Sequence, residues 1–114
     1  MFYEFNQNNS GGSFDFDEEA GITRWVIVEA ETLSEAITRA EEIGLYWNGC
    51  EDGIDCDCCG DRWYVPYEEK GSDIPSSYGV PLTSEALTQN RFGNFLADGK
   101  EACVHYADGR KEWY

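Results

Sequence analysis

Four of the five cysteines of this chain lie within ten consecutive positions, and this cluster constrains the middle of the fold more than any other feature. Cys56, Cys59 and Gly60 form a C-x-x-C-G motif, in which a tight turn directs two sulfur atoms and several backbone N–H groups at one ion. Acidic residues surround the cluster, whereas free thiols prefer apolar surroundings. The sequence therefore predicts a zinc site in this loop, and the alternative is a set of buried, reduced thiols.

The candidate metal ligands are Cys50, Cys56, Cys58, Cys59 and His105. Cys56 and Cys59 are the strongest candidates, followed by Cys50. The fourth ligand is either Cys58 or a residue of the distant segment 103–105, which contains the only histidine of the chain. Adjacent cysteines seldom reach one ion together, which slightly favours segment 103–105. We interpret the predicted ion as structural, because a catalytic zinc needs an open position and a nearby general base.

Length and composition bound the class of protein. A chain of 114 residues with 41% hydrophobic residues predicts one domain over residues 1–114 with a packed core. Segment 68–81, rich in Gly, Pro and Ser, is expected to be the least structured part. The N-terminus lacks the basic start and apolar stretch of a signal peptide, and the apolar run 25–28 is too short to cross a membrane. We therefore expect a cytoplasmic protein with reduced cysteines and no membrane contact.

Alternating and continuous apolar patterns predict the strands. Segments 2–5 and 14–17 alternate around a Gly-Gly loop and are expected to pair as an antiparallel hairpin. Segment 22–29 contains the continuous run Trp-Val-Ile-Val and is expected at the centre of the sheet. Segment 62–67 can form an edge strand, since Pro66 cannot donate to an inner ladder. Near the C-terminus, 101–106 and 110–114 flank an Asp-Gly turn that is typical of a hairpin.

One helix is expected to dominate. Thr32 and Glu35 have the spacing of a capping box, the apolar residues of 33–43 recur every three or four positions, and Gly44 supplies the helix stop. A shorter helix over 84–89 is also compatible with the pattern. The expected class is thus α+β, a mostly antiparallel sheet with one principal helix and a Cys-rich loop that zinc would staple.

The net charge of the chain limits the kinds of molecule that it can bind. The chain has 23 acidic and 8 basic residues and a net charge of −15. Direct binding to nucleic acid is not expected, because the phosphate backbone requires the opposite charge. An acidic surface can instead compete for a protein that normally holds nucleic acid, although the same charge also keeps a protein soluble and monomeric.

Two groups of residues are candidates for binding. The Asn- and Gly-rich loop can turn successive N–H groups toward an anion, such as the phosphate of a small nucleotide, although it can equally be an ordinary hairpin loop. Acidic residues near the cysteines, together with a surplus of aromatic residues, suit a protein interface. The candidates are Asn8, Asn9, Ser10, Gly11 and Gly12 in the loop, and Trp47, Asp52, Asp55 and Asp57 near the cysteines.

No catalytic pattern is recognisable. The chain has one histidine, and it offers no nucleophile elbow and no Ser/His or Cys/His pair at a readable spacing. We therefore expect a protein without enzymatic activity.

Two passages together resemble a family of small proteins encoded by tailed bacteriophages. These passages are Phe5-Asn-Gln-Asn-Asn-Ser-Gly-Gly-Ser-Phe14 and Cys56-Asp-Cys-Cys-Gly-Asp-Arg-Trp63, which match the QNNSGGxF loop and the CxCCGxRW knuckle of that family. The resemblance covers most of residues 1–67 and implies a phage origin, and hence the cytoplasm of a bacterial host.

A phage origin favours an accessory protein that binds and inhibits a host or defence protein, with its acidic surface in the place of nucleic acid. One alternative is a sponge that sequesters a nucleotide signal of a host defence system. Another is an accessory factor of the virion or of DNA metabolism.

Overall fold

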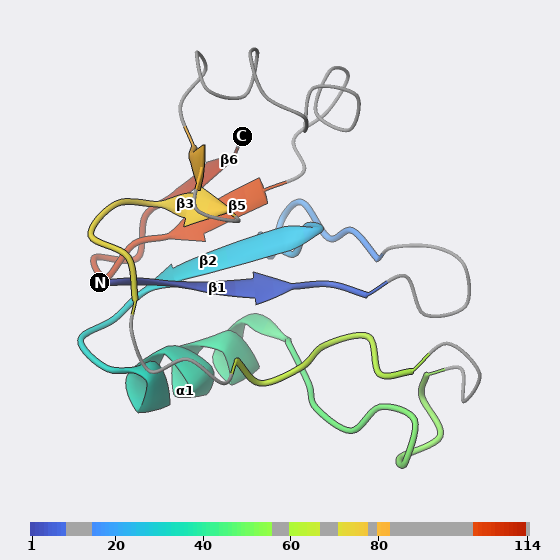
Figure 1. Ribbon diagram of the computed structural model, residues 1–114. Helices are drawn as coiled ribbons and strands as arrows, with labels where there is room; N and C mark the ends of the chain where they lie inside the picture. The colour runs from blue at the N-terminus through green and yellow to red at the C-terminus, as the bar shows by residue number, and fades with distance from the viewer. Residues whose placement is uncertain (9–14, 56–59, 67–70, 78–79, 83–101, 114) are drawn as a thin grey trace.

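The computed structural model describes residues 1–8, 15–55, 60–66, 71–77, 80–82 and 102–113 (Figure 1). Its elements are β1 (Phe2–Asn6), β2 (Trp25–Glu29), α1 (Leu33–Ile43), β3 (Ser76–Ser77), β4 (Val80–Pro81), β5 (Ala102–His105) and β6 (Lys111–Trp113). The predicted α+β class, with one principal helix and a mostly antiparallel sheet, is confirmed. None of the helices in these ranges has the length and apolar composition needed to cross a bilayer.

The main sheet has four strands in the order β1-β2-β5-β6. β2 pairs antiparallel with β1 and parallel with β5, and β5 pairs antiparallel with β6. The C-terminal hairpin is therefore confirmed, with Gly109 of its Asp-Gly turn at a φ of 93°. The sequence pattern did not reveal the parallel pairing of β2 and β5, because that contact joins segments far apart along the chain.

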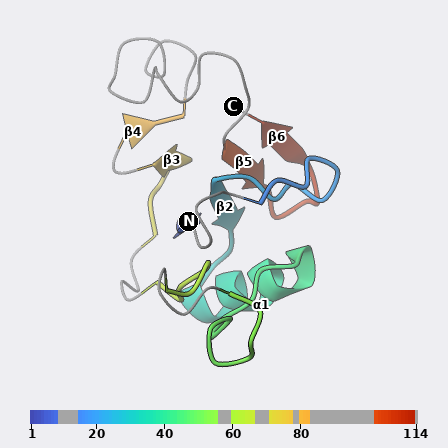
Figure 2. The same cartoon turned by 90° about the vertical axis from the view of Figure 1, so that its right-hand side faces the viewer.

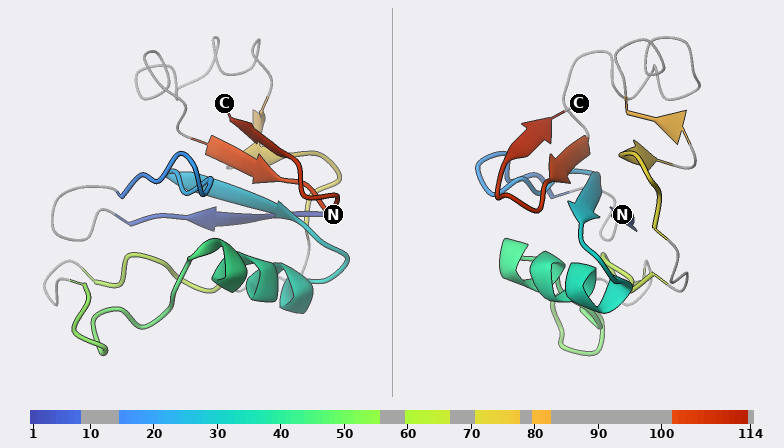
Figure 3. Two further views of the ribbon diagram at one scale, coloured as in Figure 1. Left: turned by 180° about the vertical axis from the view of Figure 1, so that it is seen from behind. Right: turned by 90° about the vertical axis from the view of Figure 1, so that its left-hand side faces the viewer.

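β2 lies between β1 and β5 and is buried on both faces, as its continuous apolar run predicted. Val26 and Val28 point to the face that α1 covers, where they form one core cluster with Ala36 and Ala40 of the helix. Trp25 and Ile27 belong to a second core cluster that includes Leu82, directly after β4. The sheet therefore lies between α1 and the β3–β4 pair (Figures 2 and 3).

The capping residues set both ends of α1. The side chain of Thr32 accepts a hydrogen bond from the backbone N–H of Glu35 at 3.2 Å, which satisfies one of the free N–H groups of the first turn. Gly44 has a φ of 126°, and its N–H bonds the carbonyls of Ala40 and Glu41. The predicted helix and both of its boundaries are confirmed.

The predicted hairpin between segments 2–5 and 14–17 is wrong. β1 pairs instead with β2 over its whole length, and Asp17 makes only an isolated bridge with Ile22. Phe16 is 53% exposed, so its alternation with aspartates does not mark a core-facing strand, and Phe14 lies outside the described residues. The apolar residues of β2 offer β1 a buried surface that segment 15–17 lacks.

The edge strand predicted over 62–67 is also wrong for its described part, 62–66. This part contains only one isolated bridge, between Trp63 and Gln7. Arg62 and Trp63 are adjacent and both buried, at 8% and 2% exposure, whereas neighbours in an edge strand point to opposite faces. Within 68–81, β3 and β4 form a short antiparallel pair, and the helix suggested over 84–89 lies outside the described residues.

Candidate functional site

The two passages on which the resemblance rests meet in space. The backbone N–H of Asn8 donates to the carbonyl of Arg62 at 2.7 Å, and the Asn8 side-chain amide donates to the carbonyl of Asp61 at 3.1 Å. Gln7 and Trp63 form the bridge that extends this contact. The end of β1 thereby positions the segment that follows the cysteine cluster.

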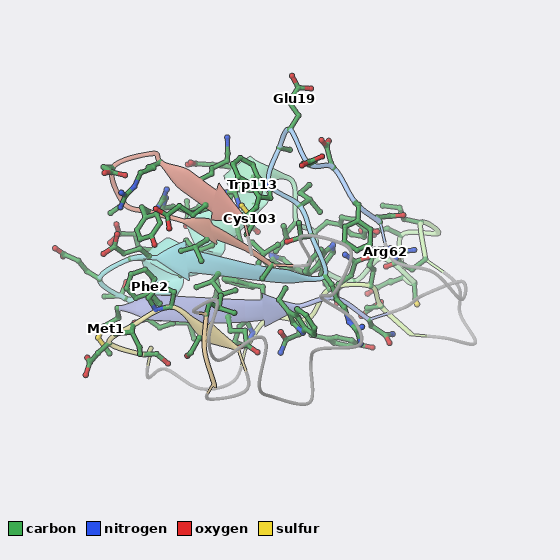
Figure 4. The ribbon with its side chains drawn as sticks, turned by 90° about the horizontal axis from the view of Figure 1, so that it is seen from above. Met1, Phe2, Glu19, Arg62, Cys103 and Trp113 are labelled. Atoms are coloured by element: carbon green, nitrogen blue, oxygen red, sulfur yellow. The ribbon has the colours of Figure 1, made fainter. Side chains whose placement is uncertain are left out.

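Arg62 is the centre of this contact and comes from the segment after the cysteines (Figure 4). One guanidinium nitrogen donates to Gln7 Oε1 at 2.9 Å, and Nε lies 3.1 Å from Asp15 Oδ2 and 3.8 Å from Asp55 Oδ1. Arg62 and Asp55 are both buried, and removing one partner of a buried charge pair typically costs about 3–5 kcal/mol. We therefore assign Arg62 a structural role, in which it ties the loop before β2 to the region of the cysteines.

The predicted binding residue Asp55 belongs to the same structural network. Its side chain is 2% exposed, accepts a hydrogen bond from the Tyr46 hydroxyl at 2.9 Å and accepts another from the Arg62 N–H at 2.8 Å. Burial, and then the hydrogen bond to the Asp55 carboxylate, raise the pKa of Tyr46 above its ordinary value. A Cβ atom at Gly49 would overlap the Asp55 carboxylate, so a glycine is required there. Asp55 thus holds the loop together and is not available to a partner.

Beside this network lies a groove of about 300 Å³, which is lined by Trp47, Asn48, Asp61, Trp63, Tyr64 and Val65. Figure 1 shows that these residues belong to the long excursion of the chain past the C-terminal end of α1. Trp47, a predicted binding residue, is half-buried and stacks on Phe5 with ring centroids 5.8 Å apart. Its indole N–H donates to Glu41 Oε2 at 2.9 Å. Trp63 is buried, whereas Tyr64 is 49% exposed.

The structure does not bring Cys50 and His105 together. The N–H of Cys50 donates to Asp61 Oδ1 at 2.9 Å, whereas His105 Nε2 lies 2.9 Å from the carbonyl of Gly21. Figure 4 shows Cys103, on the same strand as His105, beside Trp113 and well apart from Arg62. Within the described ranges no three candidate ligands gather around one point. Because Cys56, Cys58 and Cys59 lie outside those ranges, the zinc site stays a prediction.

Cys103 and His105 instead form a buried pair with Gly21. A carbonyl can only accept, so His105 Nε2 carries the proton and donates to Gly21. Burial lowers the pKa of His105 and raises the pKa of Cys103 to about 11. The thiol is therefore protonated at neutral pH, and this pair has the properties of a core contact rather than of a nucleophile and its base.

The other predicted binding residues fall into three groups. Asp52 is exposed, and its carboxylate is therefore accessible to a partner. Asn8 is half-buried and its amide bonds Asp61. Asn9, Ser10, Gly11, Gly12 and Asp57 lie outside the described residues.

Sequence reasoning did not identify Asn48 and Val65 as part of a groove. Neither residue type marks a site, and only the packing of segment 60–66 against the end of α1 brings the two positions together. A second hollow, of about 490 Å³, lies beside the N-terminal end of α1. The hydroxyl of Thr32, which lines this second hollow, already caps the helix. We therefore favour the groove lined by Trp47, Trp63 and Tyr64 as the candidate site.

In the described ranges, most basic side chains contact other groups of the protein, whereas many acidic side chains are exposed. Four of the five basic side chains contact other parts of the protein. Arg24 lies over the ring of Trp25, Arg39 bonds two backbone carbonyls, Arg62 is buried, and Arg110 lies over the ring of Tyr106. The exposed acidic residues include Asp17, Glu18, Glu19, Glu31, Glu35, Glu41, Glu42, Glu51, Asp52, Asp73 and Asp108. Figure 4 shows Glu19 projecting from the body of the protein.

Comparison with known proteins adds one family. The whole chain, residues 1–114, matches a family described as a domain of unknown function (DUF7296). The chain belongs to this family. No curated protein and no solved structure matches the chain.

Proposed function

We propose that this member of the DUF7296 family is a non-enzymatic phage accessory protein that binds a basic surface of a host or defence protein in the cytoplasm of a bacterial host. Its acidic surface would occupy the place that nucleic acid occupies on that partner. The observation that carries the proposal is the charge distribution of the described residues, in which most carboxylates are exposed while four of the five basic side chains contact other groups of the protein. A surface of this kind attracts a basic partner over long range.

α1 supplies a second argument, because the acids of its last turn are placed against its own stability. Glu41 and Glu42 lie in the last turn, which contains no basic residue, although the helix dipole favours cations there. Positions that break a local stability rule are expected at functional sites. Glu42 therefore suits a role in binding better than a role in folding.

The spacing of the acids sets a limit on mimicry of nucleic acid. Glu35 and Glu42 are seven residues apart, or roughly 10.5 Å along the helix axis. One DNA strand carries a charge about every 3.4 Å, so this pair alone is about threefold sparser than DNA. Mimicry would therefore need the flanking carboxylates of Glu31 and Glu41 as well.

The test is affinity purification from a bacterial host lysate, followed by measurement of the dissociation constant for the purified partner. We expect a basic protein whose affinity falls at least tenfold between about 50 mM and 200 mM salt, and which duplex DNA displaces. The double substitution Glu35→Lys and Glu42→Lys should weaken binding, whereas Asp73→Lys, on the other side of the sheet, should not. Binding that neither salt nor DNA affects would contradict the proposal.

The two alternatives give different results in the same experiment. A nucleotide sponge would retain a small ligand rather than a protein, and no observation on the described residues favours it. An accessory factor of the virion or of DNA metabolism would bind a phage protein and no host protein. Zinc in the Cys-rich loop would support the shape of this region in either case.

A further inference from the structure

We infer that the groove lined by Trp47, Trp63 and Tyr64 receives an arginine side chain of the partner. The inference rests on the proposed function and names the group that this surface recognises. It follows from the size of the groove, from the chemistry of its lining and from the way its side chains are held in place.

The size of the groove favours a single side chain. Its volume of about 300 Å³ lies at the lower end of the range of about 300–1,000 Å³ that pockets for small molecules occupy. The phosphate of a nucleotide would also meet the like charge of Asp61 in the lining. The groove therefore fits one extended side chain better than it fits a nucleotide signal.

The lining combines aromatic rings with a carboxylate. A cation over the face of Trp or Tyr is attracted by the ring, and a carboxylate can accept two N–H groups from the same guanidinium. Arginine matches both features, because its planar group stacks and donates in a fixed fork, which lysine cannot do. The protein already uses the same contact internally, since the guanidinium of Arg110 lies 4.2 Å from the ring centroid of Tyr106.

The side chains of the groove are held in place by neighbours. Trp47 is fixed by its stacking on Phe5 and by its hydrogen bond to Glu41. Asp61 is oriented by the N–H of Cys50. Side chains that are already ordered lose little conformational freedom when a ligand binds, so the groove is preorganised for its occupant.

The surroundings of the groove also favour a cation at a protein interface. Tyr64 and Val65 are exposed at 49% and 38%, and nearby Ile54 is exposed at 64%. Exposed Glu51 and Asp52 come from the same loop as Ile54. The apolar lining with the carboxylate of Asp61, in a strongly acidic stretch of the chain, is complementary to a basic side chain on a protein surface.

Arg62, the basic residue of the described segment 60–66, does not oppose this occupant. Arg62 is 8% exposed and its guanidinium is held by Gln7 and Asp15. The exposed carboxylate of Asp15 and the buried carboxylate of Asp55 therefore offset its charge.

The test uses N-acetyl-L-arginine amide as the probe and records the indole ¹⁵N–¹H signals of the protein by NMR. Trp47 and Trp63 should shift with a dissociation constant of about 1–10 mM, and Trp25, on the far face of the sheet, should not. The neutral analogue N-acetyl-L-citrulline amide should cause no shift, and N-acetyl-L-lysine amide should bind at least threefold more weakly. Equal shifts with citrulline or with lysine, or no shift with arginine, would overturn the inference.

Two variants test the residues. Asp61→Asn keeps an oxygen for the N–H of Cys50 but removes the charge, and it should weaken arginine binding at least fivefold, whereas Asp73→Asn should leave it unchanged. Tyr64→Leu should also weaken binding and keeps the apolar volume of an exposed side chain, so it tests the groove even if Asp61→Asn disturbs the loop. Unchanged affinity in both Asp61→Asn and Tyr64→Leu would refute the inference.

The experiment separates this inference from the proposed function, because the probe needs no partner protein. If arginine amide does not bind but a basic host protein still binds with a strong salt dependence, the groove is refuted and the function stands. If arginine amide binds as expected but no basic protein is retained, the function is refuted and the specificity of the groove stands.

Discussion

The substitution Gly21→Ala should destabilise the protein strongly, and its magnitude can be worked out from the structure. Gly21 has a φ of +76°, and a Cβ there would lie 2.6 Å from His105 Cε1, 2.8 Å from its Nε2 and 3.0 Å from Cys103 Sγ. The left-handed backbone costs an alanine about 1–2 kcal/mol. Overpacking adds about 1–3 kcal/mol, and displacing His105 from the Gly21 carbonyl removes a hydrogen bond worth about 1 kcal/mol. We expect a total loss of about 3–6 kcal/mol.

A matched control separates the steric part from the backbone part. Gly53 has a φ of +77°, but a Cβ there would have no neighbour within 4 Å, so Gly53→Ala should cost only the backbone strain. Gly109→Ala, with a φ of +93° and equally open space, serves as a second control. Urea unfolding followed by tryptophan fluorescence should show Gly21→Ala to be about 2–4 kcal/mol less stable than Gly53→Ala. Equal losses in the two variants would refute the reasoning.

Three further results are expected. Burial lowers the pKa of His105 in the folded protein below 6.5, its ordinary value in the unfolded chain. The free energy of unfolding that the buried neutral His105 contributes is therefore fully present above the unfolded-state pKa, and it is lost as the pH falls through the folded-state pKa. His105→Gln should therefore lose less free energy of unfolding than the wild type between about pH 7.5 and pH 5, and an equal loss would contradict this. Glu42→Lys should raise the melting temperature by a few degrees, because a cation in the last turn of the helix gains about 0.5 kcal/mol from the helix dipole and the reduced negative charge. Glu35→Lys, in the first turn, should lower the melting temperature for the opposite reason. Shifts of the same sign in the two variants would count against the dipole argument. Cys103, with a pKa raised to about 11, should resist iodoacetamide in the native protein, while Cys50 should react when a metal chelator is present. Peptide mapping that finds equal labelling would show that Cys103 is accessible.

Local signals predicted the elements that depend on nearby residues. The helix could be predicted from the sequence, because its N-cap Thr32, its apolar spacing and its stop residue Gly44 all lie in one short segment. β2 could be predicted as a central strand, because four consecutive apolar residues suit a strand that is buried on both faces. In the β5–β6 hairpin, the Asp-Gly turn itself sets the pairing.

Contacts between distant segments could not be predicted in the same way. The alternation over 14–17 suggested a partner for β1, but the preference of β1 for β2 depends on which surface is buried after folding. The loss of alternation at Arg62 and Trp63 depends on Gln7 and Asp15, more than 45 residues away. For the same reason the groove was not foreseen, although the sequence did draw attention to Trp47 and to the acids near the cysteines.

The most recognisable residues of the chain are therefore not the best candidates for binding. Gln7 and Arg62, which belong to the two passages that suggested a phage family, contact each other inside the protein. Glutamine and arginine are required at these two positions, because a buried guanidinium needs a hydrogen-bond acceptor beside it. Tyr64 is exposed and directly follows the second passage, so a partner can reach it without disturbing that network. A protein built in this way can change its specificity at the groove while the contact between Gln7 and Arg62 keeps the fold, and substitutions in the groove should accordingly affect binding more than stability.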